Sequence, residues 1–165
     1  MNKKFYITPH INLKELFDAE PNSLVIISEI YPELNKIKNP DIKKSIYESL
    51  TLETIAHKTN TPIADIIDKL KKDLNLNVEQ FELESVPSWL INENIVKTID
   101  ARPMIIAGQH PLQEVKEIIQ YLKAGEIFEI ITPFVPEPMI DMFKSEGINV
   151  FVKKENGMVN TYFCK

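Results

Sequence analysis

Hydrophobic residues in the second half of the chain follow two different spacings in alternation. Ile95–Ile99 alternates β-branched and polar residues, and residues 126–132 (EIFEIIT) read as apolar on both faces, so we expect two strands, the second of them central. Between them, residues 111–123 place apolar side chains three and four positions apart. That spacing predicts a helix that opens at Pro111 and stops before Gly125.

The pattern then repeats once and closes with a hairpin. Residues 133–138 form a loop with three prolines, and a helical stripe of apolar residues follows as far as Gly147. Asn149–Lys153 and Val159–Phe163 flank Asn156-Gly157, a strong signal for a hairpin turn. Residues 94–165 are therefore expected to fold as a βαβαββ two-layer α/β sandwich with a mixed sheet, its two helices on one face.

Residues 1–74 show helical spacing only, which predicts a separate bundle of short helices and an α+β class for the whole chain. Leu24–Ile30 is apolar nearly all round, so we expect it to be a buried helix. The predicted helix N-caps are Asn12, Asn39, Thr51 and Thr61. The side chains expected to face inward from the helix that starts at Pro40 are Ile42, Ile46, Tyr47 and Leu50.

The two predicted helices at residues 52–60 and 62–74 are joined by a tight turn and resemble a helix-turn-helix. In a DNA-binding protein the second helix would enter the major groove. Its first turns carry Asp65 and Asp68, which would face phosphates, while its lysines lie at the far end. We therefore expect plain helix packing and do not expect nucleic acid as the partner.

Composition bears on the expected partners and the expected location of the protein. The formal net charge of -5 argues against a general nucleic-acid binder. Cys164 is the sole cysteine, which excludes an internal disulfide and favours a reducing cytoplasm. The N-terminal residues lack the apolar run of a signal peptide, and no run is long enough to cross a bilayer, so we expect no membrane association.

An acidic stretch separates the two predicted domains. Residues 75–93 carry glutamates but no lysine or arginine, so we expect a solvated linker. Trp89 follows Pro87 and Ser88 within it. We expect this tryptophan to act as a hydrophobic clasp between the two domains.

Two resemblances follow from these motifs. ITPHINLKELFDAEP together with LNKIKNPDIKKSIYESLTLETIAHKTNTPIADIIDKL resembles the helical domain at the N-terminus of iron–sulfur repair proteins, also called the hybrid-cluster-associated redox disulfide domain. Some members carry a cysteine pair. This chain has NPDIKK in that region, so the resemblance implies the fold and a partner-docking role rather than a redox role.

IDARP, HPLQEVKEII and LKAGEIFEII resemble the TusA-like (SirA-like) sulfur-carrier fold over about residues 97–163. In those carriers a Cys-Pro opens the first helix, and a thiolate there can carry a persulfide. Pro111 matches the proline, but the residue before it is His110. The resemblance thus implies the carrier fold without the carrier thiol.

Two loops that leave the same end of neighbouring strands form the candidate site, because α/β proteins commonly place ligands there. His110 has three possible roles, namely capping or fixing its loop, contacting a ligand, or catalysis. Arg102 either pairs internally with Asp100 or reaches an anionic group. Phe134 is expected to be held by the prolines as a partner contact or a pocket wall. The candidate residues are Asp100, Arg102, Gln109, His110, Thr132, Phe134 and Glu137.

These features favour a non-catalytic binding or adaptor module. Its partner would be a protein of redox or sulfur metabolism, or a small anionic ligand bound by Arg102 and His110. We expect no cofactor and no metal, since His110 has no second histidine three or four residues away. Two alternatives stay open, which are sulfur transfer through Cys164 and nucleic-acid binding through the helical domain.

Overall fold

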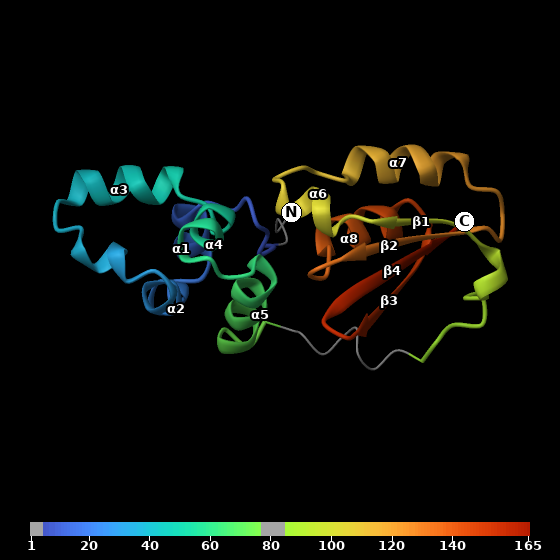
Figure 1. Cartoon of the computed structure of the whole chain (residues 1–165), viewed down its shortest axis with the longest axis horizontal. Coiled ribbons are helices and arrows are strands. Elements are labelled where there is room, and N and C mark those ends of the chain that lie inside the picture. Colours follow the sequence, from blue (N-terminus) through green and yellow to red (C-terminus); the bar gives the residue numbers. More distant parts are fainter. Residues whose placement is uncertain (1–4, 77–84) are drawn as a thin grey trace. The chain divides into compact units, whose positions relative to one another are not determined.

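The structure, a computed structural model, describes residues 5–76 and 85–165 (Figure 1). The chain divides into two compact units, Met1–Val78 and Glu79–Lys165. The first is helical, and the second combines helices with a four-stranded sheet, so the α+β class is confirmed.

The helical unit consists of short segments that begin at polar caps or prolines. They are α1 (Leu13–Ala19), α2 (Ser23–Ile30), the 3-10 helix η1 (Pro32–Lys36), α3 (Pro40–Ser49), α4 (Leu52–Thr59) and α5 (Ile63–Asp73). Asn12, Asn39 and Thr51 accept backbone N–H groups of the first turns, which confirms them as N-caps. Thr61 is wrong as a cap: α5 is preceded by Pro62, and the Thr61 hydroxyl instead accepts a hydrogen bond from Thr59.

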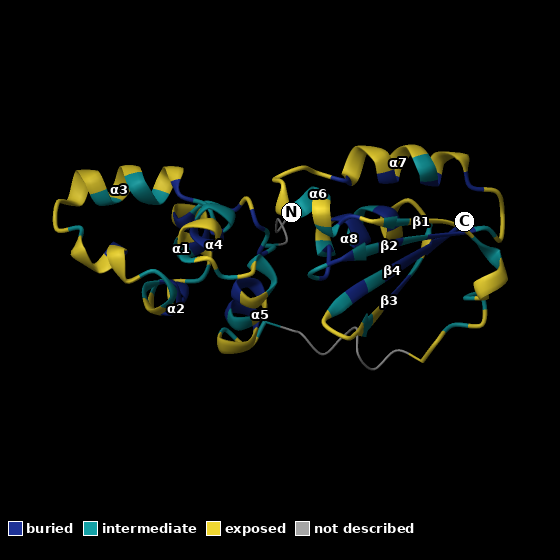
Figure 2. Cartoon of the chain, in the orientation of Figure 1, coloured by how far each residue is buried: buried dark blue, intermediate teal, exposed yellow. Residues whose placement is uncertain are grey.

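Burial in this unit differs from the sequence expectation in two helices (Figure 2). In α2, Ile26 and Ile27 are buried, but Val25 is 64% exposed, so the helix is covered on one side only. No residue of α3 is buried, and Ile42 is 54% exposed. The core of this unit forms from long aliphatic side chains, including Leu13, Leu16, Ile27, Leu34, Leu52, Ile55, Ile66, Ile67 and Leu70.

From Ile95 onward, the second unit has the expected element order with one addition. Its elements are the 3-10 turn η3 (Asn92–Asn94), β1 (Ile95–Asp100), α6 (Arg102–Ile106), α7 (Leu112–Tyr121), β2 (Ile127–Thr132), α8 (Glu137–Ser145), β3 (Asn149–Glu155) and β4 (Met158–Cys164). The added element is α6, which lies in the stretch expected to be a loop. The Asp100 side chain accepts the backbone N–H of Arg102 at 3.1 Å, and Pro103 follows, so the chain turns into a short helix directly after β1.

The sheet is mixed, with strand order β1-β2-β4-β3. β1 and β2 run parallel, whereas β4 is antiparallel to both of its neighbours. Asn156 and Gly157 link β3 to β4 with φ values of 53° and 73°. Two successive residues with positive φ make the type I′ turn that an Asn-Gly pair favours, which confirms the predicted hairpin.

Helices cover one face of this sheet. Val115 and Ile119 of α7 and Phe143 of α8 share a core with Phe128 and Phe163 of the sheet. The opposite face is covered at one end by Trp89 and Leu90, which pack against a buried cluster of the sheet (Ile127, Phe151, Tyr162 and Cys164). Trp89 therefore packs on the sheet of the second unit, and residues expected to belong to a solvated linker contribute to its core, because a large indole gains more by covering apolar sheet surface than by facing water.

Among the residues described, no helix combines the length and apolar character needed to cross a lipid bilayer.

Candidate functional site

The carboxyl ends of β1 and β2 bring the two candidate loops to the same edge of the sheet. Asp100 pairs with Ile131 in the parallel register, and the backbone N–H of Ala101 donates to the carbonyl of Ile131 at 2.9 Å. Ala101 is fully buried. The residues on either side of it are thereby held at a fixed place on the edge of the sheet.

Arg102 is fixed by two contacts with Asp100. Its Nε and Nη2 donate to the two carboxylate oxygens at 2.8 and 2.6 Å, the bidentate geometry that makes arginine–carboxylate pairs specific. This guanidinium holds the pKa of the Asp100 carboxyl below its ordinary value, first through the hydrogen bond and also through its charge. The internal pairing considered from the sequence is therefore present.

The third nitrogen of the Arg102 guanidinium contacts a weak hydrogen-bond acceptor. Nη1 lies 2.9 Å from the thioether sulfur of Met158, the first residue of β4. A thioether accepts hydrogen bonds poorly, so this nitrogen has most of its donor capacity left. Since the Arg102 side chain is 39% exposed, an anion can approach it from solvent.

Thr132 anchors the second loop beside the first. Its hydroxyl donates to the carbonyl of Phe134 at 2.8 Å and lies 3.3 Å from the carbonyl of Val159. Val159 follows Met158 on β4, so that strand links the two loops. Phe134 is half-buried, and the buried Val135 fixes the loop by packing in a cluster with Ile140, Val152 and Val159.

The other candidate residues lie at the helix ends. Gln109 and His110 are exposed between α6 and α7, and Glu137 opens α8 half-buried. The N-cap of α7 is Pro111, which has no side-chain acceptor, so His110 lies one residue too early to be that cap. The contact group thus consists of Asp100, Arg102, Thr132 and Phe134, joined through β4.

A polar cluster that the sequence pattern does not predict lies on the face of the sheet opposite the helices. The Glu129 carboxylate accepts hydrogen bonds from Thr98 at 2.9 Å and from Asn160 at 3.1 Å. Asn160 also lies 3.4 Å from the Tyr162 hydroxyl, and burial raises the pKa of that phenol. The sequence of β2 predicts apolar residues on both faces. Glu129 is instead half-buried because Thr98 and Asn160 satisfy its oxygens.

Cys164 has the surroundings of a structural cysteine. It is 4% exposed within the apolar cluster under Trp89, and burial raises the pKa of its thiol. Within the described ranges 5–76 and 85–165, no three histidine, cysteine, aspartate or glutamate side chains are placed to hold a metal ion together.

Comparison with known proteins gives one weak similarity. A heat-inducible transcription repressor HrcA from Xanthomonas oryzae pv. oryzae is 25% identical to this chain over 134 residues. The match covers 76% of this chain but 38% of the repressor, so the chain spans well under half the length of that relative. No family model matches the chain. No solved structure matches it either.

Proposed function

We propose that the second unit is a non-catalytic binding module with a TusA-like fold. It takes an anionic group, presented by a protein partner of redox or sulfur metabolism or by a small ligand, at the carboxyl ends of β1 and β2. The βαβαββ order, the strand order β1-β2-β4-β3 and helices on one face support this fold.

The observation that carries the proposal is the hydrogen bonding of the Arg102 guanidinium. The Asp100 carboxylate orients the guanidinium by accepting hydrogen bonds from its Nε and Nη2, while Nη1 contacts the Met158 sulfur. A carboxylate or phosphate oxygen accepts far more strongly than a thioether, so it would displace Met158 at little cost in side-chain ordering. Phe134, half-buried on the adjacent loop, supplies an apolar neighbour for the bound group.

The test is an NMR titration of the full chain with inorganic phosphate and with acetate at low ionic strength. We expect saturable shifts of the Arg102 Nε–H and the Met158 methyl group, and their loss in Arg102→Ala. Lys97→Ala is the matched control, because it removes an exposed cation from β1 and leaves the Asp100–Arg102 pair in place. Equal shifts in wild type and Arg102→Ala would refute the site.

The variant His110→Ala tests whether the loop between α6 and α7 also contributes to anion binding. We expect a modest weakening of binding, since His110 is exposed on the loop between α6 and α7, which follows the helix that carries Arg102. Binding abolished by His110→Ala and retained in Arg102→Ala would move the site to the loop between α6 and α7.

Sulfur transfer through Cys164 is the less favoured alternative. A carrier thiol must be an accessible thiolate, whereas this one is buried and its pKa is raised. Incubation with a cysteine desulfurase and labelled cysteine is therefore expected to leave Cys164 unlabelled in the folded protein. Label that reductant removes, and that Cys164→Ser abolishes, would favour the carrier role.

A second candidate function, nucleic-acid binding by the helical unit, is favoured by the similarity to a protein named as a transcription repressor. Its structural basis is α4 and α5, which contact each other across Asn60–Pro62. The charges on the exposed side of α5 argue against nucleic-acid binding. Asp65 and Asp68 face solvent, and Lys69 forms an ion pair with Asp73 at 2.7 Å.

Fluorescence anisotropy with a random-sequence 30-base-pair duplex tests this second function. DNA binding requires an affinity that falls steeply as salt is raised, because counterions are released from phosphates. Lys72→Ala removes an exposed cation of α5 and would reduce that salt dependence. Absence of binding at 20 mM salt would end this candidate.

A further inference from the structure

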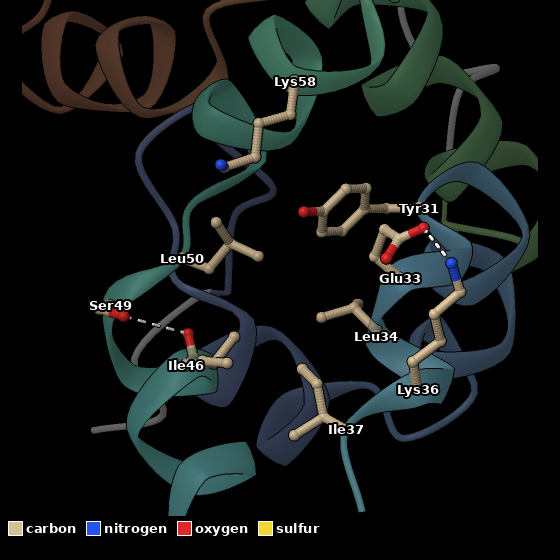
Figure 3. A pocket seen from close by; sticks show the side chains of 9 residues that line it. All are labelled: Tyr31, Glu33, Leu34, Lys36, Ile37, Ile46, Ser49, Leu50 and Lys58. Atoms are coloured by element: carbon tan, nitrogen blue, oxygen red, sulfur yellow. Dashed lines mark hydrogen bonds and ion pairs between the residues drawn. The ribbon is translucent and has the colours of Figure 1, made fainter.

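The helical unit contains a cavity that the proposed functions do not use. Its volume is about 420 Å³, within the range of small-molecule sites. It opens between η1, the end of α3 and the last turn of α4 (Figure 3). The residues that line it are Tyr31, Glu33, Leu34, Lys36, Ile37, Ile46, Ser49, Leu50 and Lys58.

The base of the cavity is aliphatic. Leu34 and Leu50 are 1% and 9% exposed, and Ile37 and Ile46 are half-buried beside them. No residue of α3 is fully buried, and its half-buried Ile46 lines this hollow. The short η1, which starts at Pro32, leaves the space open on the other side.

Polar groups at the mouth differ in whether they have partners. Glu33 and Lys36 pair with each other at 2.5 Å, and the Ser49 hydroxyl donates to the carbonyl of Ser45 at 2.9 Å. Figure 3 shows the Tyr31 ring reaching into the cavity and Lys58 extending over the same opening. Neither the Tyr31 hydroxyl nor the Lys58 ammonium has a hydrogen bond or ion pair with a residue in the described part of the chain.

We propose that this cavity binds a small apolar carboxylic acid. The aliphatic base covers the hydrocarbon part of the ligand, while the carboxylate accepts from Lys58 Nζ and from the Tyr31 hydroxyl. One uncompensated cation and one neutral donor match the single charge of a carboxylate, whereas a phosphate dianion would leave charge without a partner. Charge complementarity thus selects the acid over a neutral compound of the same shape.

The probes are octanoate and octanamide, which share a hydrocarbon chain and differ in the charge of the head group. They are titrated into the full chain while amide shifts are followed by NMR. We expect saturable shifts at Leu34, Ile46 and Leu50 with octanoate, and at least tenfold weaker binding of octanamide. Equal affinities for the two probes, or no saturable shift with octanoate, would overturn the proposal.

Three variants assign the head-group contacts. Lys58→Ala is expected to weaken octanoate binding about tenfold, as for the loss of one hydrogen bond to a charged group. Tyr31→Phe, which keeps the ring, is expected to weaken it about threefold. Lys44→Ala is the control, since it removes an exposed lysine of α3 away from the lining, and is expected to bind as wild type.

The proposal fails if Lys58→Ala binds octanoate as tightly as Lys44→Ala does. Shifts that appear at Arg102 and Met158 instead of the helical unit would also refute it, and would place the carboxylate at the edge of the sheet. Because the two sites lie in different units and respond to different variants, failure of one is distinguishable from failure of the other.

Discussion

Thr161 and Thr132 are both buried in the sheet, yet their hydroxyl groups have opposite surroundings. Thr132 donates to the carbonyl of Phe134 at 2.8 Å, whereas the Thr161 hydroxyl is fully buried without a hydrogen-bond partner among the described residues. An unpaired buried hydroxyl costs about 1–3 kcal/mol relative to its hydrated state. This contrast allows a paired experiment with one chemical change.

We expect Thr161→Val to stabilise the second unit by about 1 kcal/mol, since valine has the same shape and no polar atom to satisfy. Thr132→Val is expected to destabilise the unit by about 1–2 kcal/mol because it leaves the Phe134 carbonyl without its donor. Urea denaturation followed by tryptophan fluorescence measures both changes. Destabilisation by Thr161→Val would mean that its hydroxyl is satisfied in solution.

The Asp100–Arg102 pair makes a second prediction at the level of single residues. The pKa of Asp100 is lowered from its ordinary value of 3.8, chiefly by the hydrogen bond from Arg102. A lowered pKa in the folded state means that the pair contributes stability at pH values above 3.8 and loses that contribution as the pH falls through the folded-state pKa.

Carboxyl carbon shifts followed by NMR from pH 6 to pH 2 measure this pKa directly. We expect Asp100 to titrate below 3.8 in wild type and to return toward 3.8 in Arg102→Ala. The same midpoint for Asp100 in both proteins would show that Arg102 does not stabilise its charge.

Among the elements, the β3–β4 hairpin depends most directly on its turn residues. Gly157 has φ of 73°, and a Cβ atom added there would meet no atom within 4 Å. The cost of a side chain at this position is therefore backbone strain alone, about 1 kcal/mol for alanine.

We expect Gly157→Ala to lower the free energy of unfolding of the second unit by about 1 kcal/mol, measured by thermal denaturation. Glu155→Ala is the control, since it removes only an exposed ion pair with Lys153 and should change stability by less than about 0.5 kcal/mol. An unchanged melting temperature in Gly157→Ala would show that the turn relaxes to another type.

For the whole molecule, the residue at which the second unit begins affects the stability of that unit. Trp89 and Leu90 pack on the sheet ahead of β1, so a fragment that starts at residue 94 lacks part of its core. Full burial of a large apolar side chain contributes about 1.5–3 kcal/mol before ordering costs, and Trp89 and Leu90 are each half-buried.

We expect residues 85–165 to be more stable than residues 94–165 by about 2–4 kcal/mol in chemical denaturation monitored by circular dichroism. Trp89→Ala in the full chain should destabilise the second unit by a similar amount. Because Trp89 is the sole tryptophan, its fluorescence in the wild type reports on that unit. Equal stability of the two fragments would mean that the segment covers the sheet without stabilising it.

The kinds and order of the elements were predictable because the signals are local. A cap such as Asn39, a proline at the start of α3 and the Asn156-Gly157 pair act on residues within one turn of the chain. Spacing of apolar residues likewise separates helix from strand within ten residues. Even so, α6 was missed, because its short Arg-Pro-Met-Ile-Ile segment has no periodicity to detect.

Local patterns in the sequence therefore specify an α+β protein with helices first and a βαβαββ unit after them. They do not specify which faces are covered, since burial depends on neighbours remote in the chain: Trp89 lies on the sheet, and Ile42 stays exposed. The tertiary structure likewise decides that Arg102 meets Met158, 56 residues away, and that Tyr31 and Lys58 border one cavity. Contacts such as these arise where separate elements meet, and no local pattern encodes their positions.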